Sequence, residues 1–157
     1  MLDNKQLEYQ ESTKYGALRE LTAIKLFMEK EFTVSVPNMN VRYDFIAEKY
    51  PETIRVQVKN LKLKKGEIDD LSSHKTWCIN SYSLINGKKR PYEPEDCDMI
   101  VGVCLETGDF AIVPIDKISG KTEFRLSAHK DSKGRDYLNS YKAIINVYES
   151  ANTALDE

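Results

Sequence analysis

Two alternating segments decide the fold: Val41-Arg42-Tyr43-Asp44-Phe45-Ile46-Ala47 and Ile54-Arg55-Val56-Gln57-Val58-Lys59. Apolar and polar residues alternate in each segment, which is typical of a strand with one buried face. Residues 48–53 between them contain Pro51 and are few enough for a hairpin. The pattern therefore predicts two antiparallel strands that are joined by a tight turn.

Symmetry of this turn about Tyr50 and Pro51 predicts the pairing of the two strands. Three pairs then lie opposite each other: Asp44 with Gln57, Ile46 with Arg55, and Arg42 with Lys59. Directly opposed residues have Cβ atoms about 4.5–5.5 Å apart, whereas a slip of one residue would send them to opposite faces. In the symmetric register, Asp44, Gln57 and Lys59 converge on one face of the hairpin while the other face packs on a helix.

The helix is expected before the hairpin, over residues 12–30, because Ser12 or Thr13 can cap it. Its apolar residues recur at helical spacing and form one stripe: Ala17, Leu21, Ile24 and Met28, with Leu18 and Phe27 beside it. Residues 31–36 predict a first strand, which Pro37 ends. Glu20 lies next to the stripe, where its carboxylate either approaches the sheet or is an ordinary surface acid.

Further elements are expected downstream of the hairpin. They are a short helix near residues 67–72, a strand over 76–82, a polar loop containing Gly87 and Pro91, strands over 99–105 and 109–114, an edge strand over 123–126 and a closing helix over 136–150. The sequence Glu106-Thr107-Gly108 predicts a second hairpin turn. The order predicts one domain over residues 1–157, of the α/β or α+β class, with a mixed central sheet flanked by helices.

The charges are segregated, although their sum is small. A formal net charge of -2 argues against a protein that coats nucleic acid nonspecifically, because that mode needs many phosphate contacts. Two basic clusters stand out: Arg55, Lys59, Lys62, Lys64 and Lys65, and then Lys88, Lys89 and Arg90. Each cluster is either a DNA-contacting surface or a plain solvated surface.

The compartment and the relation to membranes follow from simple counts. The 3 cysteines form no CxxC pair, which indicates reduced thiols in a cytoplasmic protein. The N-terminal residues are polar and do not form a signal peptide. The longest apolar run, residues 99–105, is too short to span a bilayer, so no membrane association is expected.

The polar face of the first hairpin has the groups that phosphodiester hydrolysis needs. A metal ion polarises the phosphate and activates water, and a nearby cation stabilises the developing charge. Asp44, the Gln57 amide and the Val58 main-chain carbonyl offer the oxygen ligands that suit Mg²⁺, with Mn²⁺ as a substitute. Lys59 is the candidate cation and Glu20 the candidate helix acid. By spacing alone, an ordinary half-exposed hairpin remains the more frequent explanation.

A resemblance to a known family favours the catalytic interpretation. The carrying segments are Gly16-Ala17-Leu18-Arg19-Glu20-Leu21-Thr22-Ala23, Val36-Pro37, Arg42-Tyr43-Asp44, Ile54-Arg55-Val56-Gln57-Val58-Lys59, and downstream Ser81-Tyr82, Glu95-Asp96-Cys97-Asp98 and Gly108-Asp109-Phe110-Ala111-Ile112-Val113-Pro114. Together they resemble the PD-(D/E)xK nuclease superfamily, and within it the group I intron-encoded homing endonucleases, whose third motif is Gln-x-Lys.

This resemblance implies a restriction-endonuclease-like core and a role for each motif residue. The metal-binding acid falls on Asp44, the variable acid-or-glutamine position on Gln57, the catalytic lysine on Lys59 and the helix-borne acid on Glu20. Tyr43 stands where the superfamily name has proline. Gln57 is a neutral residue at a position where the family can have an acid, so the metal site has one negative charge fewer. Glu20 is then needed to supply that charge. If Glu20 is not in place, an inactive relative is the alternative.

The function implied is a Mg²⁺-dependent endonuclease that cuts double-stranded DNA in the manner of a homing enzyme. Because one active site cuts one strand, a dimer or tetramer is expected. DNA contacts are expected from Lys62, Lys64 and Lys65 and from Lys88, Lys89 and Arg90, the latter in residues 83–98 as a possible DNA-contacting insertion. A Holliday-junction resolvase, which should be more basic, a restriction endonuclease and a catalytically silent DNA-binding or assembly module remain alternatives.

Overall fold

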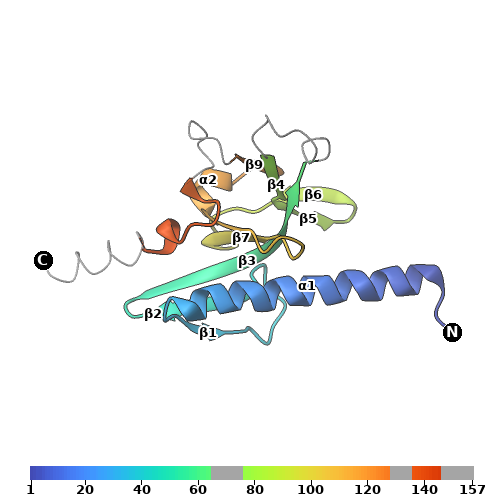
Figure 1. The fold of residues 1–157 in the computed structure, drawn as a ribbon, viewed down its shortest axis with the longest axis horizontal. Helices are drawn as coiled ribbons and strands as arrows, with labels where there is room; N and C mark the ends of the chain where they lie inside the picture. The colour runs from blue at the N-terminus through green and yellow to red at the C-terminus, as the bar shows by residue number, and fades with distance from the viewer. Residues whose placement is uncertain (65–75, 128–135, 146–157) are drawn as a thin grey trace, which may run out of the picture.

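The computed structural model describes residues 1–64, 76–127 and 136–145 and is shown in Figure 1. In chain order its elements are α1 (Asn4–Glu29), β1 (Thr33–Ser35), β2 (Phe45–Lys49), β3 (Glu52–Leu63), β4 (Thr76–Asn80), β5 (Tyr82–Ile85), β6 (Lys88–Pro91), β7 (Met99–Val103), β8 (Phe110–Pro114), α2 (Ile115–Ile118) and β9 (Glu123–Ser127). Within these ranges no helix has both the length and the apolar character to cross a bilayer.

The long strand β3 organises the main sheet. It pairs antiparallel with β2 through its first residues and with β4 through its last, and β7 lies parallel along its other edge. Further out, β1 pairs with β2, β8 pairs with β7, and β9 pairs with β4. Seven strands of the described chain thus form one mixed sheet, as expected. The hairpin β7–β8 and the edge strand β9 are confirmed.

The register of the first hairpin is confirmed within β2 and β3, although the expected pairs Asp44–Gln57 and Arg42–Lys59 lie beyond the ladder, which ends at Phe45 and Val56. Ile46 lies opposite Arg55 and Phe45 opposite Val56, as the symmetric turn requires. The strand is displaced, however, since β2 begins at Phe45 and continues to Lys49 rather than spanning residues 41–47. At Asp44 the chain leaves the ladder, because the Asp44 carboxylate, in place of a backbone carbonyl, accepts the hydrogen bond of the Val58 N–H at 2.7 Å.

Helix α1 differs from the expectation in its start and in its buried face. It begins at Asn4, where the Asp3 side chain and Gln6 form a capping box, and the expected caps Ser12 and Thr13 lie inside the helix. The buried residues are Ala23 and Phe27. The expected stripe was wrong, since Leu21 is 62% and Met28 60% exposed.

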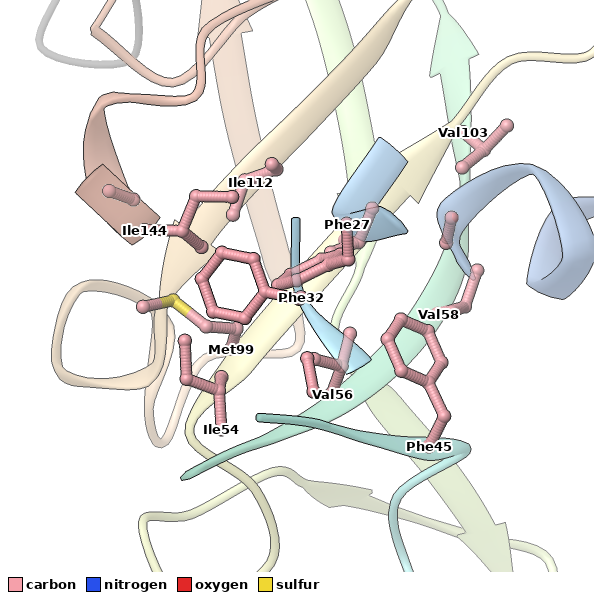
Figure 2. Close-up of a cluster of buried hydrophobic side chains, with 14 residues drawn as sticks. Phe27, Phe32, Phe45, Ile54, Val56, Val58, Met99, Val103, Ile112 and Ile144 are labelled. Carbon is pink, nitrogen blue, oxygen red and sulfur yellow. The ribbon is translucent and has the colours of Figure 1, made fainter. Parts of the chain in front are cut away.

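Aromatic packing explains which face of α1 is buried. The Phe27 ring meets Phe32 and Phe45 edge to face, each with centroids 5.4 Å apart, inside the apolar cluster of Figure 2. Ala23, one turn earlier, is fully buried and small enough to let the helix approach the sheet. This orientation turns Glu20, at i−3 from Ala23, toward the sheet.

The sheet carries an apolar cluster on each face. Met99, Val101 and Val103 of β7 belong to the cluster under α1, whereas Ile100 belongs to the second cluster, which also contains α2 residues. A strand buried on both sides needs this continuous apolar sequence. Helices therefore flank the mixed sheet on both faces, which confirms the expected fold class.

Three further expectations need correction or lie outside the described residues. The polar loop around Gly87 is a separate antiparallel hairpin, β5–β6, with positive φ at both Asn86 and Gly87. The strand expected over 76–82 is divided, because β4 ends at Asn80 and Tyr82 begins β5. The closing helix starts at residue 142 rather than 136, and its part beyond residue 145 lies outside the described residues, as does the helix expected near 67–72.

Candidate active site

A break in strand pairing along β3 creates the candidate site. β2 pairs with β3 up to Val56, and β4 pairs with it only from Leu61 onward. Among the described strands, none therefore covers residues 57–60 on that edge, while β7 covers the opposite edge. The backbone of Val58 is consequently available to side chains there.

The cleft at this break has a volume of about 220 Å³. Its lining comes from α1 and from the first hairpin: Gly16, Arg19, Glu20, Asp44, Gln57, Val58, Lys59 and Asn60. All the expected site residues, Glu20, Asp44, Gln57, Val58 and Lys59, thus line one cleft.

The backbone of β3 holds both the main-chain N–H and the side-chain carboxylate of Asp44. Its N–H donates to the Val56 carbonyl at 2.8 Å, and its carboxylate oxygen Oδ2 accepts from the Val58 N–H at 2.7 Å. Burial raises the pKa of Asp44, and the Val58 hydrogen bond and the Lys59 charge oppose that rise. The carboxylate is therefore fixed in place with one oxygen committed to the backbone.

Glu20 reaches Asp44 from helix α1. The two carboxyl groups are within hydrogen-bonding contact, and the pKa of Glu20 is raised by burial, by the Asp44 charge and by that hydrogen bond. Two carboxylates at such range repel each other unless a proton or a cation lies between them. A divalent cation between the two groups could take the place of such a proton.

Lys59 lines the same cleft as Asp44. Its ammonium donates to the Tyr82 carbonyl at 3.0 Å and lies 5.0 Å from the Tyr92 ring centroid. Burial lowers the pKa of Lys59, the Asp44 charge opposes this, and Arg42 adds to the lowering. The ammonium is thus held at the base of the β5–β6 hairpin, close enough to Asp44 for their charges to interact.

Gln57 is almost fully buried, with 8% of its surface exposed. Its amide nitrogen Nε2 donates to the Val58 carbonyl at 3.2 Å. A metal ion that bound both the Gln57 amide oxygen and the Val58 carbonyl would replace this hydrogen bond. Both oxygens belong to neutral groups, so they add ligands without adding negative charge.

The donor set of the cleft fits a hard divalent cation. No group of three or more His, Cys, Asp and Glu side chains suited to a metal occurs within residues 1–64, 76–127 and 136–145. The cleft instead offers two carboxylates and two neutral oxygens. Mg²⁺ and Mn²⁺ accept such oxygen ligands and complete their shells with water.

Comparison with known proteins identifies the family. A family model described as PD-(D/E)XK endonuclease matches residues 10–144, a range that contains the entire cleft. The chain belongs to the PD-(D/E)XK endonuclease family. The structure is also similar to that of a bacterial homing endonuclease, I-Ssp6803I, with a TM-score of 0.67 and 17% sequence identity, covering 86% of this chain and 93% of that one. No match was found among curated proteins.

This PD-(D/E)XK chain has three cleft residues that the sequence interpretation missed: Gly16, Arg19 and Asn60. Gly16 and Arg19 lie on the same inward side of α1 as Glu20, one turn or less from it. The signal was the spacing of Gly16, Glu20 and Ala23 at i, i+4 and i+7, which the more apolar stripe on the outer face obscured.

A second groove, of about 420 Å³, continues from the PD-(D/E)XK cleft. The two share Lys59 and Asn60, and the groove is also lined by Lys62, Asn80, Tyr82, Ser83 and Leu84. Lys62 is therefore placed next to the cleft. Lys64 is the residue directly after β3, which ends at Leu63. Lys65 lies outside the described residues.

The wall of this groove is the β5–β6 hairpin, which is anchored to the protein by Arg42. The Arg42 guanidinium donates to Ser83 Oγ at 2.7 Å and to Asp96 Oδ2 at 2.8 Å. Lys89 stacks over the Tyr82 ring at 4.7 Å, and Arg90 lies 3.6 Å from Asp96. Lys88, Lys89 and Arg90 are all exposed on β6, so the hairpin presents positive charge beside the groove.

Proposed function

We propose that the chain is a metal-dependent endonuclease that cuts double-stranded DNA, with Mg²⁺ as its usual ion and Mn²⁺ as a substitute. The observation that carries the proposal is that Glu20, Asp44 and Lys59 line one cleft. Membership of a family of endonucleases supports the reaction type. One folded domain over residues 1–157 would perform it.

Each site residue has a role that follows from its position. Asp44, Gln57, the Val58 carbonyl and Glu20 would hold the ion, which when bound polarises the phosphate and lowers the pKa of water. The Lys59 ammonium would donate to the phosphate or orient the attacking water. Because Asp44 is fixed by the Val58 N–H, this ligand is in place before the substrate arrives, which favours electrostatic stabilisation.

The DNA strand would extend from the cleft along the adjoining groove. Lys62 lines that groove, and Lys64, Lys65, Lys88, Lys89 and Arg90 would add phosphate contacts on either side. Positive side chains at these places compensate for the net charge of -2. Residues 83–98, which contain the β5–β6 hairpin, would serve as the DNA-contacting insertion.

A homing-type role is favoured over the related nuclease roles. The structural neighbour I-Ssp6803I is a homing endonuclease, and the small net charge is lower than expected of a Holliday-junction resolvase, which reads branch shape through many backbone contacts. A restriction endonuclease remains the nearest alternative in chemistry. A catalytically silent module is disfavoured because the helix acid and the lysine both reach the cleft.

Double-strand cutting requires two sites, so we propose a dimer or tetramer. The outer face of α1 is the candidate contact, because Leu18, Leu21 and Met28 are 40%, 62% and 60% exposed there. A second copy of the same helix would cover these residues and form a symmetric interface. Sedimentation of the wild type and of Leu21→Glu would test this, since the variant should shift toward the monomer.

The reaction is tested with three DNA substrates: supercoiled plasmid, linear duplex and a four-way junction. Wild-type protein should give discrete products with Mg²⁺ and none with EDTA. Preference for the duplex would support the homing or restriction role, and preference for the junction would support resolution. DNA binding without any cleavage would replace the proposal with the silent module. An intracellular location is consistent with the buried free thiols of Cys78, Cys97 and Cys104.

A further inference from the structure

We propose that Arg19 is a second cation of the active site and binds the scissile phosphate through its guanidinium group. This inference rests on the proposed function and adds a substrate-binding residue that neither the motif nor the family assignment supplies. It is carried by the burial of the Arg19 Nε atom, by the missing partner of that atom and by the place of Arg19 in the cleft.

The Nε–H of the Arg19 guanidinium is uncommitted in the described part of the chain. Its Nε atom is buried and has no hydrogen-bond partner there. Buried polar atoms are nearly always paired, and an unpaired donor has a desolvation cost that folding alone does not recover. We therefore expect an acceptor that enters the cleft to pair with this N–H once the Arg19 side chain turns toward it.

The position of Arg19 indicates which acceptor is missing. Arg19 lines the same cleft as Glu20, Asp44 and Lys59, and a cleft of about 220 Å³ admits one phosphate group rather than a whole nucleotide. The phosphate that enters is the one that the metal ligands and Lys59 would act on. Arginine suits it, because the planar guanidinium can donate two parallel hydrogen bonds to phosphate oxygens.

The charges of the cleft agree with this assignment. A bound divalent cation would balance the Glu20 and Asp44 carboxylates, which leaves Lys59 and Arg19 as the net positive groups of the cleft. Attack of hydroxide on a phosphodiester gives a pentavalent phosphorane with two negative charges. Lys59 from β3 and Arg19 from α1 would therefore match that charge, whereas Lys59 alone would not.

Gly16, one turn before Arg19 and Glu20, leaves the cleft accessible. A Cβ atom at Gly16 would have no atom within 4 Å, so open space lies over this part of α1. A DNA strand can therefore pass close to the helix backbone and place a phosphate against Arg19.

Glu106 is the main internal partner to exclude. The Arg19 charge contributes to lowering the pKa of Glu106, but it is the smallest of the causes. Glu106 Oε2 instead accepts from the Cys104 thiol at 3.2 Å. Glu106→Gln therefore serves as a control that should leave cleavage unchanged.

The test compares Arg19→Gln and Arg19→Lys with Lys25→Gln, a matched control on the exposed side of the same helix. Single-turnover cleavage of plasmid DNA is measured with Mg²⁺, and affinity for a duplex oligonucleotide is measured with Ca²⁺ in place of Mg²⁺. Arg19→Gln should slow cleavage by about 10²–10³-fold. Arg19→Lys should restore only part of the rate, because lysine cannot donate the parallel pair of hydrogen bonds.

Two controls separate phosphate binding from a structural role. Affinity for the duplex should fall at most severalfold in Arg19→Gln, since one of many phosphate contacts is lost. The unfolding temperature should not decrease, because the substitution removes a buried donor that lacks a partner. In the wild type, the NMR signal of the Arg19 Nε–H should shift when the duplex is added with Ca²⁺.

The outcomes distinguish this inference from the proposed function. If the wild type cuts DNA and Arg19→Gln cuts it equally fast, Arg19 has no such role while the endonuclease assignment stands. Equal losses in Glu106→Gln and Arg19→Gln would also overturn it. If the wild type cuts no substrate, the proposed function fails, and an Arg19 Nε–H signal that DNA leaves unmoved would overturn the phosphate contact as well.

Discussion

The carboxyl groups of Glu20 and Asp44 lie within hydrogen-bonding contact, although one comes from helix α1 and the other from the residue before β2. Burial raises the pKa of both groups. Two half-buried acids whose charges interact cost free energy in a protein without metal, and a divalent cation would remove that cost. Metal binding should accordingly be linked to stability.

Mg²⁺ should raise the unfolding temperature of the wild type, because a ligand that binds only the folded state stabilises it. At ten times the dissociation constant the gain is about 1.4 kcal/mol. Glu20→Gln should reduce the shift, since one charged ligand is lost. Thermal unfolding with and without Mg²⁺ measures this, with the exposed Glu29→Gln as the control. An undiminished shift in Glu20→Gln would remove Glu20 from the metal site.

Two substitutions at Gly16 should separate the stability of the protein from the access of DNA to the cleft. Gly16→Ala should stabilise the protein by about 1 kcal/mol, because alanine favours a helix and its Cβ would contact nothing within 4 Å. Gly16→Trp should fold equally well yet block the approach of DNA to the cleft. Denaturant unfolding and plasmid cleavage check the pair; normal cleavage by Gly16→Trp would contradict the proposed DNA path.

Lys62→Gln should weaken DNA binding in a salt-dependent manner. If Lys62 contacts one phosphate from the groove beside the cleft, the slope of log affinity against log salt concentration should decrease by about 0.9. Lys25→Gln should leave that slope unchanged. Fluorescence anisotropy of a labelled duplex at several salt concentrations gives both slopes. Equal slopes for wild type and Lys62→Gln would place the DNA elsewhere.

The Cys97 thiol should resist alkylation in the folded protein. Burial, followed by the charges of Asp96 and Asp98, raises its pKa to about 12. At pH 8 the group therefore stays protonated, and the reactive thiolate is scarce. Mass spectrometry after iodoacetamide treatment should show Cys97 modified only in denaturant. Rapid modification without denaturant would show that this part of the core is accessible.

Much of the site was predictable from the sequence because it depends on local pairing. The symmetric turn gave the correct register of β2 and β3, and Asp44, Gln57 and Lys59 line one cleft beside it. The sequence Asn86-Gly87 also had the signal for a hairpin. The polar residues around it favour a loop, yet both residues have the positive φ that such a turn needs.

The face of α1 could not be predicted in the same way. Leu21 and Met28 are as apolar as the residues that are buried, so periodicity favoured the wrong stripe. The choice depends on packing between distant segments, since Phe27 fits between Phe32 and Phe45. A helix that turns Arg19 and Glu20 inward contradicts its own hydrophobic pattern, which is expected at a functional site.

The central claim is tested most directly by Mg²⁺-dependent cleavage of DNA by the wild type and by Asp44→Asn. Asparagine can still accept the hydrogen bond of the Val58 N–H that holds Asp44 at 2.7 Å, so the fold should persist while the ligand charge is lost. The account predicts discrete products from the wild type and none from the variant. Equal cleavage by both proteins would contradict it.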